Sequence, residues 1–161
     1  MTQPAPEPAI TATMKTFGYP ETLIADYTWW SVLLRPKQVT YGSLILAAKA
    51  NVTALSDLTA AAFSELAVVT SAIEQSLAAA IKYEKINYLA LMMVDPEPHF
   101  HVIPRYRGTR TMGDLDFPDT GWPGPPALND AIALSAAQSS TLRDALASHW
   151  PNTGTLGETG I

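Results

Sequence analysis

The sequence predicts a small α+β domain in which one long helix covers an antiparallel sheet. Short runs of aromatic and branched residues, a single long stretch with helical periodicity, and proline- or glycine-containing breaks between them favour this class. The 161 residues, 47% of them hydrophobic, suffice for one core, so we expect a single domain over residues 18–150. The proline-containing segment 1–17 is expected to be a flexible lead-in, and residues 151–161 a tail.

The first half of the domain is expected to supply two antiparallel strands and the long helix. Residues 25–34 are rich in aromatic and branched side chains, and residues 43–48 form a second apolar run after a short polar connection. From about Thr59 to Lys82, apolar residues recur at helical spacing, with alanine filling much of the remainder. This pattern predicts a helix whose stripe from Phe63 to Ile81 is core.

The second half is expected to contain two more strands, a long loop and a C-terminal helix. Residues 86–94 are mostly apolar and predict a central strand, and the next strand follows a proline-containing break and ends at Pro104. Prolines and glycines crowd the end of residues 105–126, which we expect to be an irregular loop. Ser135 is a suitable N-cap for a helix running to His149.

Composition excludes several classes of function. A net charge of −5 argues against bulk nucleic acid as a partner, although a local pocket can still hold a small phosphate ester. The absence of cysteine excludes disulfides and thiolate zinc sites. The N-terminus lacks the pattern of a signal peptide, and no apolar run approaches the roughly 20 residues that span a bilayer. We therefore expect a cytoplasmic protein that does not contact membranes.

Two of the three histidines, His99 and His101, lie two residues apart in the last predicted strand. Side chains alternate across a strand, so both imidazoles point to one face, and Glu97 has the same parity. Imidazoles titrate near neutral pH and can act as nucleophiles, proton carriers or metal ligands. A metal held by these three residues would need a further ligand, and His149 is the only histidine left.

The segment Glu97-Pro98-His99-Phe100-His101-Val102-Ile103-Pro104-Arg105 resembles the signature of the histidine triad (HIT) family, His-x-His-x-His followed by apolar residues and often Pro-Arg. Upstream segments resemble the family in the right order, so that the likeness covers Tyr27 to Tyr106. They are residues 32–36, residues 39–46, Lys49, residues 52–58 and Asn87. The resemblance implies an antiparallel sheet with one long helix packed on it, plus a C-terminal helix.

The resemblance also implies a mechanism. The middle histidine of the triad, here His99, attacks the α-phosphate of a nucleotide and forms a nucleotidylated imidazole that water hydrolyses. His101 holds the third position, which contacts the phosphate. The implied substrates are diadenosine polyphosphates or nucleoside phosphoramidates, and the implied assembly is a homodimer. No protein-bound metal is needed for covalent attack, although a divalent cation can accompany the substrate.

Several positions depart from the family pattern. Glu97 replaces the first triad histidine. A carboxylate at this position can orient a neighbouring imidazole and would favour the protonated form of that imidazole. Arg35 stands where many members hold ribose with an aspartate; arginine only donates, so we expect weaker preference for ribose over deoxyribose. The family's Gly-Gln-Ser-type segment is replaced by residues 92–95. The candidate nucleotide- or phosphate-binding residues are Arg35, Ser43, Lys49, Asn51, Asn87, Arg105 and Trp122.

Two other function classes stay open from the sequence. The changes at Glu97, Ser43 and Arg35 would suit a nucleotide-binding sensor that has lost efficient turnover. A metal-dependent enzyme using Glu97, His99 and His101 is the second alternative, and sensitivity to a chelator would distinguish it. Large aromatics such as Trp29 and Trp30 are more typical of a core than of a base-stacking site.

Overall fold

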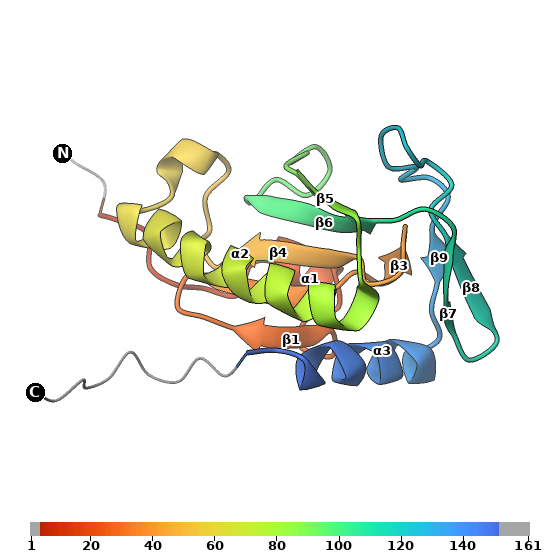
Figure 1. Cartoon of the computed structure of the whole chain (residues 1–161). Helices are drawn as coiled ribbons and strands as arrows, with labels where there is room; N and C mark the ends of the chain where they lie inside the picture. Colours follow the sequence, from red (N-terminus) through yellow and green to blue (C-terminus); the bar gives the residue numbers. More distant parts are fainter. Residues whose placement is uncertain (1–3, 152–161) are drawn as a thin grey trace, which may run out of the picture.

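The computed structural model describes residues 4–151, which form a five-stranded antiparallel sheet with helices on both faces (Figure 1). The strand order is β1-β2-β4-β6-β5. The sheet strands are β1 (Leu23–Asp26), β2 (Trp30–Leu34), β4 (Leu44–Ala48), β5 (Lys85–Leu89) and β6 (His99–Arg105). The predicted α+β class is confirmed.

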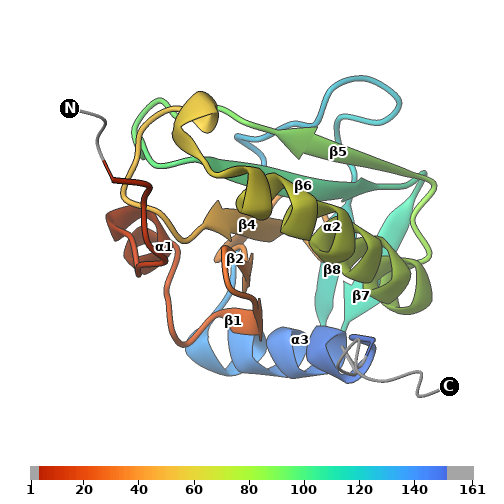
Figure 2. The ribbon, with the colours of Figure 1, turned by 90° about the vertical axis from the view of Figure 1, so that its left-hand side faces the viewer.

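The long helix α2 (Ala60–Ile81) and the C-terminal helix α3 (Ala136–Ser148) enclose the larger core. The Thr59 hydroxyl caps the start of α2 by accepting from the backbone N–H of Ala62, and the helix begins close to its predicted start. A capping box at Ser135, the predicted N-cap, begins α3, whose Leu142 and Leu146 are buried. The remaining helix, α1 (Ala12–Thr16), lies on a different side of the sheet from α2 (Figure 2).

Register explains which side chains face which helix. Leu33 pairs with Ile45, and Ile45 pairs with His101, so these side chains share the face covered by α1. The neighbouring positions, among them Leu46 and Val102, face α2 instead. The histidines therefore lie on the face that α2 does not cover.

The single strand predicted for residues 25–34 is wrong, because residues 27–29 turn the chain between β1 and β2. The carboxylate of Glu65 on α2 accepts hydrogen bonds from the backbone N–H groups of Thr28 (3.0 Å) and Trp29 (2.6 Å). Glu65 thus supplies hydrogen-bond acceptors for the backbone of the turn. Because Glu65 is far away in the sequence, the local composition of residues 25–34 does not reveal this contact.

The strand predicted for residues 86–94 is shorter than expected and is not central. It ends at Leu89 and forms the edge of the sheet, and Met93 and Val94 are 85% and 90% exposed. The predicted apolar stripe of α2 also needs correction, because Phe63 is 45% exposed. Its neighbour Ala62 faces the sheet, where its carbonyl accepts from the Trp30 indole, and successive helical residues diverge by about 100°.

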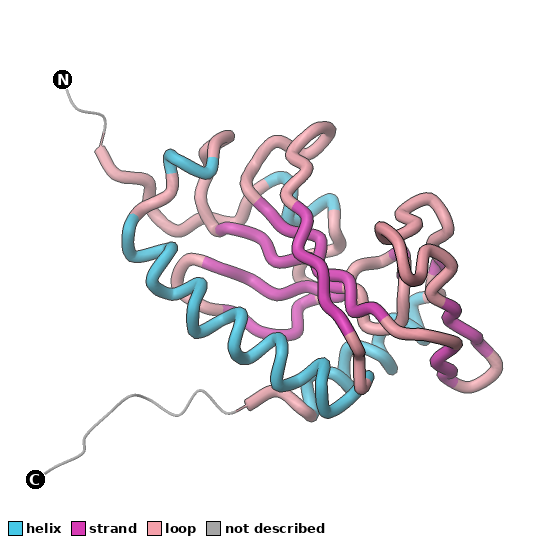
Figure 3. Tube along the Cα trace, turned by 45° about the horizontal axis from the view of Figure 1, so that its top comes forward, coloured by secondary structure: helices cyan, strands magenta, loops and turns pink. Residues whose placement is uncertain are grey.

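The predicted loop 105–126 contains an unexpected hairpin, β7 (Thr109–Met112) and β8 (Leu115–Pro118). Gly113 takes a positive φ of 58° in its turn, a conformation that glycine adopts without strain. A second small pairing joins β3 (Lys37–Gln38) to β9 (Ile132–Ala133), and the short helical turn η1 (Leu55–Asp57) precedes α2. Figure 3 shows the hairpin at one end of the sheet, beside the loop that follows it.

The second part of the lead-in expected to be flexible, residues 11–17, is folded. Thr11 caps α1, and Met14 is fully buried against the sheet. Residues 1–3 of the predicted lead-in and residues 152–161 of the predicted tail lie outside the described residues. No helix within residues 4–151 has the length and apolar character needed to cross a membrane.

Candidate active site

His99 opens strand β6 with its ring on the α1 side of the sheet. Its Nδ1 lies 2.8 Å from the backbone carbonyl oxygen of Glu97. A carbonyl oxygen only accepts hydrogen bonds, so Nδ1 carries the ring proton of the neutral imidazole. Nε2 therefore keeps its lone pair and is the atom able to act as a nucleophile.

His101 has the opposite arrangement. The Nε–H of Arg35 donates to its Nδ1 over 3.3 Å, which leaves the proton of the neutral ring on Nε2. Burial, followed by the nearby Arg35 and His99, lowers the pKa of His101 to about 4. The ring is neutral at pH 7, and its Nε2–H is a hydrogen-bond donor. The two ring centroids are 5.1 Å apart, so the site offers one lone pair beside one N–H group.

The buried side chain of Gln38 fixes the loop that holds Arg35. Its amide nitrogen donates to the carbonyl of Arg35 (2.6 Å) and to that of Ser43 (2.9 Å), while its oxygen accepts from the N–H groups of Gly42 and Ser43. The Ser43 hydroxyl is buried in the same network and donates to the carbonyl of Thr40. Ser43, a predicted ligand-binding residue, is thus occupied with shaping the loop.

Helix α1 and the residue after it cover the two imidazoles. The Phe17 ring lies 5.6 Å from the ring of His99 and 5.7 Å from that of His101, centroid to centroid. The Thr13 hydroxyl donates to the Glu97 carboxylate, which is therefore engaged with α1. Only 2% of His99 and 7% of His101 are exposed. Neither Thr13 nor Phe17 could be predicted from the sequence, because the lead-in shows no helical periodicity.

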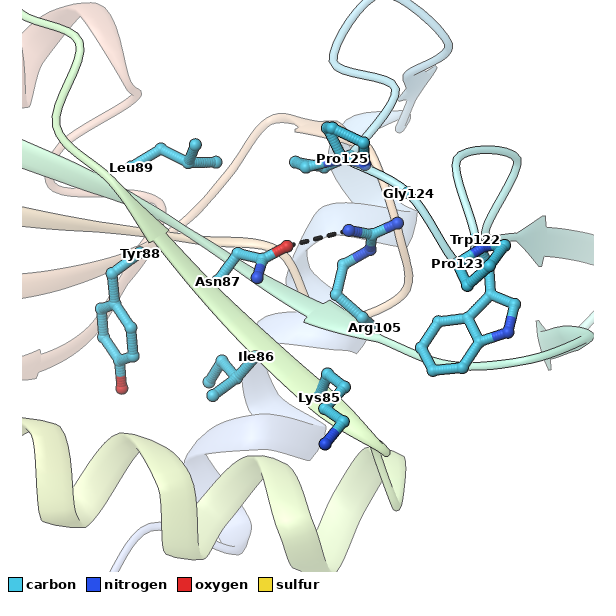
Figure 4. Close-up of a pocket in the computed structure, with 11 residues that line it drawn as sticks. Lys85, Ile86, Asn87, Tyr88, Leu89, Arg105, Trp122, Pro123, Gly124 and Pro125 are labelled. Carbon is cyan, nitrogen blue, oxygen red and sulfur yellow. Dashed lines mark hydrogen bonds between the residues drawn. The ribbon is translucent and has the colours of Figure 1, made fainter.

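Three other predicted residues meet at a second position on the same side of β6. Asn87, Arg105 and Trp122 line a cavity of about 870 Å³ along the edge strand β5, together with the proline-rich segment after Trp122 (Figure 4). Leu89 lines one end of this cavity and pairs with His101, so the cavity begins beside the histidines.

The guanidinium of Arg105 is already paired with other side chains, which limits its ability to bind phosphate. Its Nε and Nη2 reach the two carboxylate oxygens of Asp119 at 2.7 and 3.0 Å, and its Nη1 donates to the Asn87 side-chain oxygen over 2.8 Å. All of Arg105 but 4% is buried. Asp119 was not foreseen from the sequence, since it lies in the segment predicted to be irregular.

The remaining predicted residues lie elsewhere. Lys49 binds the Asp26 carboxylate (3.0 Å) and the Tyr27 carbonyl (2.8 Å), and Asn51 is exposed in the turn after β4. Trp30 is fully buried and Trp29 packs against the same core, so their expected structural role is supported.

The arrangement does not support the alternative of a metal site formed by Glu97, His99 and His101. The Glu97 carboxylate is bound to Thr13, and the guanidinium of Arg35 occupies Nδ1 of His101. Within residues 4–151, no three histidine or acidic side chains are placed to hold an ion together.

No family model matches the chain, and no curated protein is significantly similar to it in sequence. Solved structures do match it. A histidine triad protein from Bradyrhizobium japonicum superposes with a TM-score of 0.68 at 22% identity, covering 90% of this chain and 99% of that one. The chain has the histidine triad fold. A second histidine triad protein, from Marinobacter aquaeolei, gives a TM-score of 0.69 at 18% identity, with coverage of 89% and 96%.

The likeness of fold extends to a solved structure of stated activity. The diadenosine triphosphate hydrolase of Plasmodium falciparum, solved with cyclomarin A, gives a TM-score of 0.59 at 10% identity and covers 81% of this chain and 76% of that one. The fold inferred from residues 97–105 is thereby confirmed, although the identities are low enough that the likeness is one of fold.

Proposed function

We propose that this protein is a nucleotide-phosphate hydrolase or nucleotidyl transferase that works through a covalent nucleotidyl-histidine at His99. The observation that carries the proposal is the 2.8 Å contact between His99 Nδ1 and the Glu97 carbonyl, which leaves the Nε2 lone pair free. A neutral imidazole so oriented is nucleophilic at pH 7 without a metal or a general base.

The chemistry proceeds in two displacements. Nε2 of His99 forms a bond to the α-phosphorus as the bond to the leaving group breaks, and the leaving group departs with the bonding electrons. Water then attacks the same phosphorus and breaks the P–N bond, which regenerates the imidazole. The Nε2–H of His101 donates to a non-bridging phosphate oxygen in both steps and stabilises the charge that builds up there.

The surroundings of the histidines suit a substrate with a nucleoside part. The cavity along β5 has about 870 Å³, within the usual range for small-molecule sites, and the Trp122 side chain at its rim offers a surface on which a base can stack. The activity of the Plasmodium falciparum structural neighbour favours diadenosine polyphosphates as the first compounds to assay, with nucleoside phosphoramidates beside them. The homodimer and the cytoplasmic location expected from the sequence stay predictions.

The test is hydrolysis of adenosine 5′-phosphoramidate and diadenosine triphosphate by the wild type and by His99→Ala. Removal of a covalent nucleophile should lower kcat by on the order of 10⁴-fold or more. His149→Ala is the matched control, because this exposed histidine lies at the end of α3 and should leave turnover unchanged. Full activity of His99→Ala would overturn the mechanism, and loss of activity in a chelator would favour a metal instead.

One observation favours a second candidate, a nucleotide-binding sensor with little turnover. Only 2% of the nucleophilic histidine is exposed, and Phe17 lies against both imidazoles. In this candidate, α1 and Phe17 keep substrates away from Nε2 of His99. If nucleotide binding is measurable while neither compound is hydrolysed, the sensor is the better description.

A further inference from the structure

A smaller cavity of about 250 Å³ lies on the other side of the histidine pair from β5, between the end of α1 and the turn after β2. Its walls are Thr16, Phe17, Arg35, Pro36 and Lys37. Arg35 uses Nε on His101 and Nη1 on the carbonyl of Lys37. Its third nitrogen, Nη2, makes no hydrogen bond to any residue in the described part of the chain, so it is available to a ligand.

Arg105 and Arg35 differ in how their charge is met. Arg105 is neutralised by Asp119 through two short contacts. Arg35 is half-buried, and no carboxylate of residues 4–151 lies within 4 Å of its guanidinium. Partial desolvation of a charge without a counter-charge is also costly. An anion entering beside Arg35 would supply the missing pair, and Lys37 adds a second cation to the same wall.

The position of Arg35 indicates which anion this is. The guanidinium binds Nδ1 of His101, whereas Nε2 on the far side of the ring is the atom that faces the reacting phosphate. The anion bound by Arg35 is therefore a second anionic group of the substrate. It is separated from the reacting phosphate by the imidazole ring of His101. In a nucleotide whose 5′-phosphate reaches His99, the ribose is the part attached to that phosphate on the side away from the leaving group.

We propose that this cavity binds a phosphate ester on the 2′ or 3′ oxygen of the substrate's ribose. The free Nη2 carries two N–H groups that can donate to phosphate oxygens, and the cavity is below the size of a site for a whole nucleoside. An unmodified ribose would meet only donors at Arg35, since a guanidinium accepts no hydrogen bond. The substrate class of the proposed enzyme is then a ribose-phosphorylated nucleotide; this inference rests on the function proposed above.

Calorimetric titration of the full chain with AMP, adenosine 2′,5′-bisphosphate and adenosine 3′,5′-bisphosphate, at one ionic strength, tests this. One bisphosphate should bind at least about tenfold more tightly than AMP, as a charge-assisted hydrogen bond to Arg35 implies. In Arg35→Gln the ratio of the two dissociation constants should fall to within about threefold. Lys15→Gln, which removes an exposed cation on α1, should keep the wild-type ratio.

The outcomes separate the inference from the function it rests on. Bisphosphates that bind no more tightly than AMP, or an unchanged ratio in Arg35→Gln, overturn the inference even when the phosphoramidate is hydrolysed normally. A tenfold preference that depends on Arg35, together with no hydrolysis of any nucleotide, supports the anion site and overturns the enzyme. Absence of binding for all three compounds overturns both.

Discussion

The two imidazoles differ in function because their neighbours differ. A backbone carbonyl two residues away sets the tautomer of His99, which is a local contact along the chain. The tautomer of His101 depends on Arg35, which is 66 positions away in sequence, and Arg35 depends on the buried amide of Gln38. Sequence reasoning selected His99, His101 and Arg35 as candidates, but it could not reveal that the last two touch.

Glu97 illustrates the same limit, and it yields a prediction about the rate–pH profile. Its backbone carbonyl meets His99, while its carboxylate is bound by Thr13. Glu97→Gln keeps an acceptor for Thr13 and should leave the acid limb of the profile in place, with kcat within about threefold of the wild type. The measurement is kcat/KM for adenosine phosphoramidate across pH.

A shift of the acid limb to lower pH in Glu97→Gln would contradict this, because it would mean that the carboxylate stabilises a protonated imidazole. Thr13→Val is the companion variant. It removes the donor to Glu97 and should give a profile of unchanged shape, since the carbonyl that orients His99 belongs to the backbone.

Among the elements, α1 is the one whose importance was hidden. Its five residues are too few to form a stable helix alone, and burial of Met14 and Phe17 on the sheet holds it in place. The longer helices α2 and α3 carried caps and periodic apolar residues, so the sequence predicted both. Elements that exist because of distant contacts, such as the turn held by Glu65 and the hairpin β7–β8, were missed.

The cover formed by α1 predicts how the histidines react with diethyl pyrocarbonate. In the wild type, exposed His149 should be modified first, while His99 and His101 react slowly beneath Phe17. Phe17→Ala should raise their modification rate by on the order of tenfold, because opening the cover then costs less burial of apolar surface. Peptide mapping by mass spectrometry assigns each site.

Phe63→Ala provides the control, since it removes an exposed phenylalanine from α2. It should change none of the three rates by more than about twofold. Equal, fast modification of all three histidines in the wild type would mean that α1 does not protect them.

The hairpin β7–β8 is followed directly by Asp119, and this connection predicts a large stability effect. Asp119→Ala leaves the buried Arg105 guanidinium without its counter-charge and should lower the free energy of unfolding by about 3–5 kcal/mol. Asp144→Ala removes an exposed partner of Arg143 and should cost at most about 0.5 kcal/mol. Urea unfolding monitored by tryptophan fluorescence measures both, and similar midpoints for the two variants would contradict the role given to the buried pair.

For the whole molecule, the sequence predicted the class and the order of the main elements because hydrophobic periodicity and caps are local properties. The same information did not reveal that the sheet's two faces serve different purposes, one packing α2 and α3 and the other holding the histidines under α1. Strand parity placed both histidines on one face, but which helix covers that face follows from pairing between strands far apart in sequence.

Burial of His101 on that face couples the stability of the whole fold to pH. Its pKa is about 4 in the folded protein and near the ordinary 6.5 in the unfolded chain. Between these values the unfolded chain binds a proton that the folded protein does not. The contribution of neutral His101 to the free energy of unfolding is therefore complete above pH 6.5 and is lost as pH falls toward 4. The loss amounts to about 3 kcal/mol, and it should be absent from His101→Gln, whose side chain can still accept from Arg35. Urea unfolding at pH 7 and pH 4.5 should therefore show a smaller drop for this variant than for the wild type or for His149→Gln, and equal drops in all three would mean that the imidazole of His101 is not held neutral by the fold.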